Sequence, residues 1–318
     1  MSLIGFLGSA LPADETQRWS VQQLRALSGL SAPEALFGRR EALARADVHQ
    51  QWAQWFIQGI ADPFRYFEAG LGYAHIFSDS LAAITRTFPA LTRDERLDLS
   101  RLVANKILDT VAELRGEQER GSLDREARLL LLELAGLQPR CWICGLPFVT
   151  EAIDAFIDQS GNGAIVLPDF IDALKPIGLF KRDLSIEIDH IHPFSRGGSD
   201  SFENLRLACG WCNRHKGAAV SLYDTEGRLR QAAAKGTSFV SLPQPFWVVR
   251  ILATQRRCEH IEGCSHCAED SELTVTTTAG SGAPTPTNLR VTCAAHDPLR
   301  ATRLLPRKTA ASLWGVSP

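Results

Sequence analysis

All eight cysteines of this 318-residue chain lie between Cys141 and Cys293, and the first 140 residues contain none. Four of them form two C-x-x-C units, Cys141 with Cys144 and Cys209 with Cys212. Each unit places two thiolates on one side of a tight turn, within reach of a tetrahedral ion. Four thiolates leave no coordination position for water, so the pattern predicts one structural zinc. A redox-active C-x-x-C is the alternative, but it usually requires a thioredoxin-like strand–helix junction.

Composition limits the classes of protein that could use such a site. Lys and Arg number 34 and Asp and Glu 36, so a net charge of −2 excludes a globally basic nucleic-acid coat and leaves only local contacts. Hydrophobic residues at 45% exclude a disordered chain. Apolar runs are too short to predict a membrane span. The first thirteen residues lack the basic start of a secretory signal, so we expect a reducing cytoplasm, where clustered cysteines bind metal rather than pair as disulfides.

The cysteine-free segment, residues 1–138, is predicted to be an all-helical domain for recognition or partner docking. Thr92 and Glu95 form a capping box ahead of apolar residues at helical spacing, and residues 125–134 predict a last short helix. Aromatic residues in another apolar-periodic stretch are interpreted as core, with a ligand pocket as the alternative. These aromatic residues are Trp52, Trp55 and Phe56.

Between the two C-x-x-C units lie residues suited to acid–base and metal chemistry. The pattern predicts a strand ending in Asp189-His190, a glycine turn at 197–198, a second strand starting near Asn204, and a helix after the second C-x-x-C unit. A hairpin packed on a helix would bring Asp189, His190 and Asn213 together. Aspartate offers a hard oxygen ligand, and histidine is a base near neutral pH. Hydrolysis of a phosphodiester needs both a base to deprotonate water and a cation to neutralise the phosphate.

The motifs of residues 141–217 resemble those of the HNH nucleases, with the ββα-metal fold in its zinc-stapled form. Their order is C-x-x-C, D-H-x-x-P, G-G, N-L and C-x-x-C-N-x-x-K. The resemblance implies an α+β protein in which the N-terminal all-α domain is followed by a zinc-stabilised ββα-metal domain at 139–222. We expect an insertion at about 148–183 and a small C-terminal zinc-binding α/β module at 223–318.

The resemblance also implies a role for each motif residue. His190 falls on the general base, and Asn204 falls on the middle asparagine that holds the base-bearing loop in shape. Asp189 and Asn213 fall on the two protein ligands of a catalytic divalent cation, Mg²⁺ or Mn²⁺, with His215 as an alternative ligand. The chain thus has an H-N-N pattern rather than a strict H-N-H pattern. The implied reaction is one-metal, in-line hydrolysis that leaves 5′-phosphate and 3′-hydroxyl ends.

Several cations near these motifs are candidates for holding the phosphate backbone of DNA. For each of them singly, a plain surface charge is the alternative. These cations are Arg196, Arg206, Arg214 and Lys216.

Residues 258–297 repeat parts of the same pattern, which predicts a second structural zinc. Residues 288–293 (NLRVTC) match residues 204–209 (NLRLAC), while Thr276-Thr277 replaces the Asp-His pair. The segment is therefore either a degenerate ββα-metal copy that has lost its base or an independent zinc ribbon. The predicted ligands are Cys264, Cys267, Cys293 and His296, with Cys258 as the alternative to either cysteine of the C-x-x-C unit.

From the sequence we expect a metal-dependent DNA endonuclease. Its expected partners are DNA and a further protein bound through the helical domain, and its expected setting is bacterial restriction or phage defence. The alternative is a non-catalytic, zinc-stabilised nucleic-acid-binding or scaffold protein. The intact motif residues favour the enzyme, because a pure binding protein needs no base beside a metal.

Overall fold

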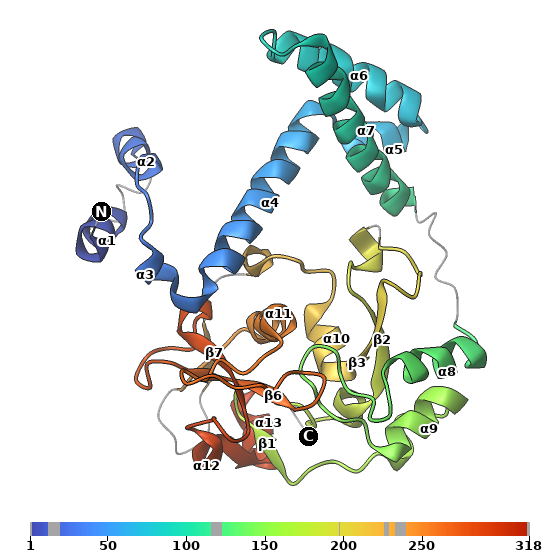
Figure 1. Cartoon of the computed structure of the whole chain (residues 1–318), viewed down its shortest axis with the longest axis vertical. Coiled ribbons are helices and arrows are strands. Elements are labelled where there is room, and N and C mark those ends of the chain that lie inside the picture. Colours follow the sequence, from blue (N-terminus) through green and yellow to red (C-terminus); the bar gives the residue numbers. More distant parts are fainter. Residues whose placement is uncertain are drawn as a thin grey trace.

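The computed structural model describes residues 2–11, 20–115, 123–196, 198–225, 229–232 and 240–316. Among these residues, the N-terminal third is helical, and the rest of the chain contains both helices and short pairs of strands (Figure 1). The predicted mixture of helices and strands is therefore confirmed. The N-terminal helices are α1 Leu3–Ala10, α2 Val21–Ser28, α3 Glu34–Phe37, α4 Glu41–Ile60, α5 Pro63–Glu68, α6 Tyr73–Thr87 and α7 Arg93–Arg115.

Helix α7 begins at the predicted capping box. Glu95 Oε2 accepts hydrogen bonds from the backbone N–H and the hydroxyl of Thr92, both at 2.8 Å, and Thr92 Oγ1 accepts one from the Glu95 N–H at 3.3 Å. Val103, Ile107 and Val111 follow at intervals of four residues, so they share one face of the helix. This face is buried against α6 and forms the core of the helical segment.

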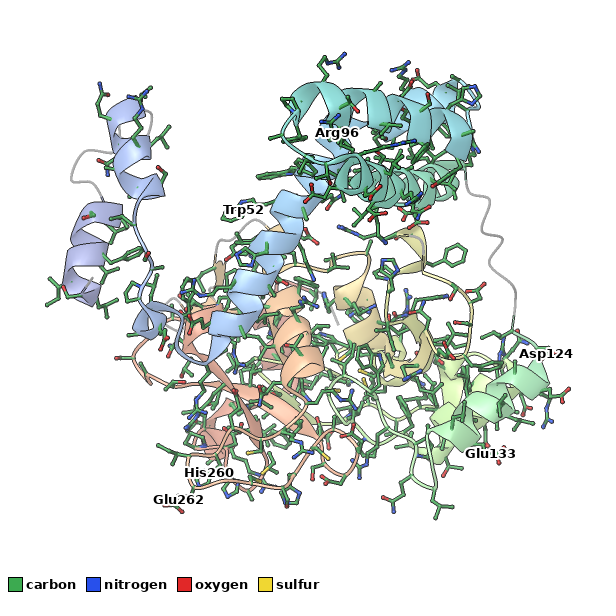
Figure 2. The ribbon with its side chains drawn as sticks, turned by 45° about the horizontal axis from the view of Figure 1, so that its top comes forward. Trp52, Arg96, Asp124, Glu133, His260 and Glu262 are labelled. Atoms are coloured by element: carbon green, nitrogen blue, oxygen red, sulfur yellow. The ribbon has the colours of Figure 1, made fainter. Side chains whose placement is uncertain are left out.

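Helix α4 departs from the sequence-based interpretation. The prediction that Trp52, Trp55 and Phe56 are core residues is wrong, because 58%, 61% and 41% of their surfaces are exposed. Trp52 is labelled on α4 in Figure 2. The buried residues of α4 are instead Ala44 and Asp47. Apolar residues occur on more than one face of this helix, so their periodicity predicts the helix but not the face that is buried.

The cysteine-containing half of the chain consists of short helices and paired strands. The helices are α8 Arg125–Leu134, α9 Thr150–Asp158, α10 Gly210–Lys216, α11 Pro245–Gln255, α12 Arg300–Arg303 and α13 Arg307–Leu313. The strands are β1 Phe170–Asp172, β2 Ile186–His190, β3 Leu205–Cys209, β4 Arg230–Ala232, β5 Val240–Leu242, β6 Leu273–Thr277, β7 Leu289–Cys293 and β8 Leu304–Pro306. The described strands pair in twos, all antiparallel: β1 with β8, β2 with β3, β4 with β5, and β6 with β7.

The hairpins β2–β3 and β6–β7 have the same length and the same register. All four strands have five residues, and the first residue of each hairpin pairs with a cysteine, Cys209 in one and Cys293 in the other. Helix α11 contacts α10 and both strands of the second hairpin, and most of its apolar residues are buried. One hydrophobic core therefore extends across both hairpins. It contains residues from both sides of position 222, the predicted boundary between the ββα-metal domain and the C-terminal module.

The expected insertion at about 148–183 contains α9 and β1. In the β1–β8 pair, Ile171 lies opposite Leu305, which comes from close to the end of the chain. Trp314 Nε1 donates a hydrogen bond to the carbonyl of Ala173 at 3.0 Å, and Trp314 and Ile171 share a small core. The insertion is therefore joined to the C-terminal residues through β1, while α9 contacts β2 of the hairpin that follows.

Buried polar contacts hold α4 against the cysteine-containing half of the chain. Asp47 is fully buried, accepts a hydrogen bond from the Leu222 backbone N–H at 2.6 Å, and pairs with Arg250 at 2.7 Å. Arg40, just before α4, forms a buried ion pair with Glu259. Such pairs are costly to break, because the remaining partner is left as an uncompensated buried charge.

None of the described helices is both long and apolar enough to cross a membrane.

Candidate active site and zinc centres

The cysteines of the first two C-x-x-C units form one buried group. The Sγ atoms of Cys141, Cys144, Cys209 and Cys212 all lie within 4.8 Å of one another. Cys209 ends β3 and Cys212 lies in α10, while a hydrogen bond from the Gly145 N–H to the Cys141 carbonyl (2.8 Å) closes the other turn. Burial raises the pKa of the Cys209 and Cys212 thiols well above the ordinary value, and a cation bound among the sulfurs would favour their ionised form. Four sulfurs with no open position suit a structural zinc.

A second group joins Cys258, Cys264, Cys293 and His296, whose ligand atoms also lie within 4.8 Å of one another. His296 presents Nδ1, which lies 3.6 Å from Cys258 Sγ and 3.5 Å from Cys293 Sγ. The ring of His260 stacks on the ring of His296, with 3.8 Å between centroids. Three sulfurs and one imidazole are again a donor set for structural zinc.

Cys267 is not part of this second group, which corrects the ligand set predicted from the C-x-x-C unit. Arg257 pairs with Cys267 in an antiparallel bridge, so the next residue, Cys258, faces the opposite side of the bridge from Cys267. Cys267 Sγ instead donates a hydrogen bond to Asp270 Oδ2 at 3.4 Å. Cys258, the alternative, takes the fourth place. The spacing of a C-x-x-C unit predicts a turn, but it does not predict which way the second thiol faces.

His190, the last residue of β2, lines a cavity of about 450 Å³ that we call the active-site cavity. Asp189, Asn213 and Arg214 line the same cavity. The hairpin and α10 therefore bring together three residues of the predicted site, although Asn213 comes more than twenty residues after the other two.

The active-site cavity also contains Asp200, a residue that the sequence analysis did not identify. Asp200 comes from the loop between β2 and β3, and its Oδ1 lies 2.6 Å from His190 Nε2. Phe194, from the same loop, packs edge-on against the His190 ring at 5.4 Å between centroids. The only sequence signal was an acidic residue beside the glycine turn, and this position is equally typical of a solvated loop.

Asn204 holds the loop that follows β2. Its Oδ1 accepts a hydrogen bond from the His192 N–H at 2.8 Å, and its Nδ2 donates to the carbonyls of His192 (3.0 Å) and Ser199 (2.9 Å). Gly198 permits this close packing, because a Cβ at that position would lie 1.9 Å from the His192 carbonyl oxygen. The other glycine of the turn, Gly197, lies outside the described residues. The three hydrogen bonds tie the two ends of the loop together.

Asp189 is 3% exposed, and both of its carboxylate oxygens are engaged. Trp142 Nε1 donates to Oδ2 and Lys216 Nζ donates to Oδ1, both at 2.9 Å. Burial raises the pKa of Asp189, and the nearby Lys216 ammonium opposes that rise. The prediction that Lys216 contacts phosphate is wrong, because Lys216 is 8% exposed and also donates to the His190 carbonyl. A buried carboxylate draws the ammonium inward, where it compensates the charge.

Asp189 and Asn213 are a chemically suitable pair for a catalytic divalent cation. Carboxylate and amide oxygens are the hard donors that Mg²⁺ prefers, and each oxygen has more than one lone pair. Asn213 Nδ2 donates to Glu187 Oε2 at 2.8 Å, so its amide nitrogen, not its oxygen, faces that carboxylate. His215, the alternative ligand, packs against Trp211 at 4.7 Å between ring centroids and is not among the residues that line the active-site cavity.

The other three predicted phosphate-contacting cations lie in different places. Arg214 lines the active-site cavity and pairs with Asp183 at 2.7 Å. Arg196 pairs with Asp224 at 3.2 Å and lines a neighbouring cleft of about 710 Å³ against α4 and α7. Arg206 donates to backbone carbonyls near the end of the loop and lines a third cavity. Of these four cations, Arg214 is the one placed in the active-site cavity.

The geometry agrees with a comparison against known families. Residues 179–219 match the family model of the HNH endonucleases. This HNH region contains β2, the loop, β3 and α10, and it includes His190, Asn204 and Asn213. An HNH domain suggests nuclease activity in general. No curated protein and no solved structure matched the chain.

The second hairpin has the loop clamp of the HNH region without its base. Asn288 Oδ1 accepts a hydrogen bond from the Ala279 N–H at 2.8 Å, and Nδ2 donates to the carbonyls of Ala279 (3.3 Å) and Ala283 (2.9 Å). In the shared register, Thr276 and Thr277 take the positions of the Asp-His pair of the HNH region. The second hairpin therefore keeps the scaffold of the loop and lacks the imidazole.

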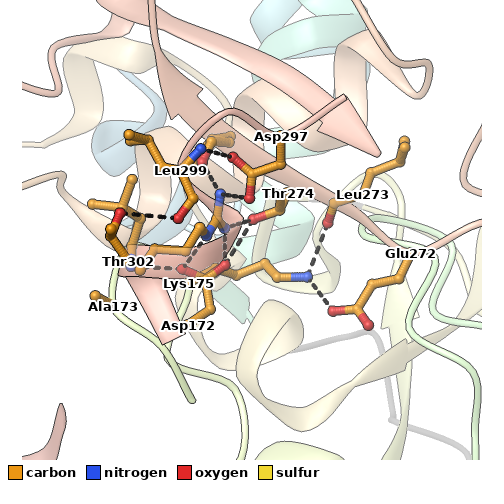
Figure 3. Close-up of polar contacts among 12 residues, drawn as sticks. Asp172, Ala173, Lys175, Glu272, Leu273, Thr274, Asp297, Leu299 and Thr302 are labelled. Carbon is orange, nitrogen blue, oxygen red and sulfur yellow. Dashed lines mark hydrogen bonds and ion pairs between the residues drawn. The ribbon is translucent and has the colours of Figure 1, made fainter. Parts of the chain in front are cut away.

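A guanidinium group lies in the second hairpin at the place that corresponds to Glu187 and Asn213 of the HNH region. Arg303 pairs with Asp297 at 3.0 Å and with Asp172, and it donates to the hydroxyl of Thr274 and to the carbonyl of Val275 (2.9 Å). Figure 3 shows Asp172, Thr274 and Asp297 converging there. By register and motif, Thr274 and Asp297 correspond to the Glu and Asn that contact each other in the HNH region. In the second hairpin, the Arg303 guanidinium thus supplies a positive charge at this place.

Proposed function

We propose that the chain is a metal-dependent endonuclease that hydrolyses phosphodiester bonds of DNA, with His190 as general base. The observation that carries this proposal is that His190, Asp189 and Asn213 line one cavity inside the HNH region. A base beside a pair of hard oxygen donors is what hydrolysis of a phosphodiester requires.

In the proposed reaction, each of these residues has a separate role. His190 takes a proton from the attacking water. Asp189 and Asn213 would hold a divalent cation, Mg²⁺ or Mn²⁺, which when bound would supply charge stabilisation for the phosphate and the departing 3′ oxygen. Arg214 holds a phosphate oxygen through its guanidinium group. Asn204 keeps the loop that carries the cavity wall in shape.

The remaining parts of the chain have supporting roles in this proposal. The two cysteine-rich groups bind structural zinc and hold the two hairpins, and residues 1–138 serve recognition or partner docking. The setting that we propose, bacterial restriction or phage defence, is based on analogy with other nucleases that join a helical domain to an HNH domain.

The test is nicking of supercoiled plasmid DNA with Mg²⁺ or Mn²⁺ by wild type, His190→Ala and a matched control, His75→Ala. His75 is exposed on α6, outside the HNH region. We expect His190→Ala to cut at least about 100-fold more slowly, the usual contribution of a general base, and the control to cut as wild type does. A wild type that binds the plasmid but cuts it with neither ion would favour the binding or scaffold alternative. Equal rates for wild type and His190→Ala would assign the cutting to another residue or a contaminant.

A further inference from the structure

We propose that Asp200 is a positioning residue that orients His190, and that Nδ1 is the nitrogen that takes the proton from water. This inference rests on the proposed nuclease function. It adds a residue outside the H-N-N pattern and assigns the two ring nitrogens of the base to different tasks.

The contact between Asp200 and His190 is short and partly shielded from solvent. Asp200 Oδ1 lies 2.6 Å from His190 Nε2, and the two side chains are 33% and 18% exposed. An ionised carboxylate can only accept a hydrogen bond, so Nε2 carries the hydrogen, and in the neutral ring Nδ1 carries the lone pair. Phe194 packs against the ring and limits its rotation. The imidazole is therefore held in one tautomer and one orientation, with Nδ1 left as the basic atom.

The second hairpin shows that the asparagine clamp forms without an acid at the position of Asp200. Both loops have an asparagine before the second strand, a carbonyl acceptor five residues earlier, and a glycine six residues earlier, Gly198 or Gly282. Four residues before the asparagine, the HNH loop has Asp200, whereas the second loop has Pro284. The second hairpin also has Thr277 at the position of the base. The first hairpin has both Asp200 and His190, and the second hairpin has neither an acid nor an imidazole at these positions. The hydrogen bonds of the asparagine clamp are present in both hairpins.

Two other roles for Asp200 lead to different results. If Asp200 were a third ligand of the catalytic cation, its replacement would lower the affinity for divalent ions. If it only fastened the loop, its replacement would lower thermal stability and leave the turnover of the folded protein unchanged. As a positioning residue, it affects the turnover and the tautomer of His190.

Asp200→Asn is the variant that separates these roles. Its side-chain amide can donate to Nε2, which selects the opposite tautomer and places the hydrogen on Nδ1. We expect kcat for plasmid nicking to fall at least tenfold, and at most by the roughly 100- to 10,000-fold that a general base contributes, with KM for DNA unchanged. Asp200→Glu keeps the carboxylate and should recover part of kcat.

Nitrogen-15 NMR of the Mg²⁺-loaded, histidine-labelled protein reads the tautomer directly, with His190 assigned by the loss of its signals in His190→Gln. We expect Nε2–H in wild type and Nδ1–H in Asp200→Asn. Calorimetry should give both proteins the same affinity for Mn²⁺, whereas Asp189→Asn loses affinity. The melting temperature of Asp200→Asn should stay close to that of wild type, because the second loop holds the same clamp with a proline at this position.

Any of three results would overturn the proposal. These are an unchanged kcat in Asp200→Asn, an Nδ1–H tautomer in wild type, or a loss of Mn²⁺ affinity in Asp200→Asn that equals the loss in Asp189→Asn. The wild-type spectrum provides this test even if the variant does not fold. A wild type that fails to cut DNA would instead count against the nuclease proposal, and the spectrum would still decide whether Asp200 orients His190.

Discussion

Asn204 and Asn288 make the same three hydrogen bonds in two different hairpins. Each side chain accepts one backbone N–H and donates to two carbonyls, one of which lies five residues before it. Only the first of these loops is next to a histidine. Comparing variants of Asn204 and Asn288 can therefore distinguish the contribution of the clamped loop to stability from its contribution to cleavage.

Replacing either asparagine with alanine should cost a similar amount of stability but affect activity differently. Asn204→Ala and Asn288→Ala each leave one N–H and two carbonyls without their partner, which we expect to lower the free energy of unfolding by about 1–2 kcal/mol. Only Asn204→Ala should also slow plasmid nicking, by at least about tenfold. Urea unfolding and nicking rates measured on the same samples test this. Equal losses of activity in both variants would indicate a general effect on folding.

The zinc content should distinguish Cys258 from Cys267. We expect elemental analysis to find two zinc ions per chain in wild type and in Cys267→Ser, because Cys267 lies outside both ligand groups. Cys258→Ser removes one of four donors and should retain one zinc after dialysis against a mild chelator. Loss of zinc from Cys267→Ser, with retention in Cys258→Ser, would restore the ligand set predicted from the C-x-x-C spacing.

Removing the Lys216 ammonium should make the stability of the protein depend on divalent ions. Lys216→Met leaves Asp189 buried without its cation, and we expect a loss of about 3 kcal/mol in the free energy of unfolding. Millimolar Mn²⁺ should restore part of this loss, because an ion bound at Asp189 replaces the missing charge. Lys106→Met is the matched control, since Lys106 forms an exposed pair with Asp109 and should change stability by less than about 1 kcal/mol. A melting temperature of Lys216→Met that does not respond to Mn²⁺ would argue against Asp189 as a metal ligand.

Asp47 should contribute more to stability than any exposed acidic residue of the helical segment. Asp47→Ala removes a fully buried carboxylate that pairs with the half-buried Arg250 and accepts a backbone N–H, and we expect a loss of about 3 kcal/mol in the free energy of unfolding. Asp98→Ala, which breaks an exposed pair with Arg101, should cost less than about 1 kcal/mol. Calorimetric melting of the two variants gives the comparison. Similar melting temperatures would mean that α4 is held mainly by apolar contacts.

Features that depend on neighbours in the sequence could be predicted. The capping box of Thr92 and Glu95 predicts the start of α7, because its two partners are three residues apart. The alternation of apolar residues likewise predicts β2 and β3, and the match of residues 288–293 to 204–209 anticipates a second hairpin. In each case, the signal and the structure involve the same short segment.

Features that depend on distant elements could not be predicted. The exposure of Trp52 follows from how α4 packs, which its own periodicity does not determine. Lys216 turns inward because Asp189, on another element, is buried. Asp200 becomes a partner of His190 only once the loop is folded. The choice of Cys258 over Cys267 likewise depends on a bridge between two segments.

The pairing of β1 with β8 limits how the protein can be shortened. A fragment of residues 139–222 would contain the HNH match but would lack the strand that satisfies Phe170–Asp172, together with α11 and the second hairpin. It would present an unpaired strand edge and an apolar surface, which promote aggregation. The smallest portion that can be expected to fold by itself therefore extends through α13, and a truncation meant to isolate the catalytic part has to retain the carboxyl-terminal tail.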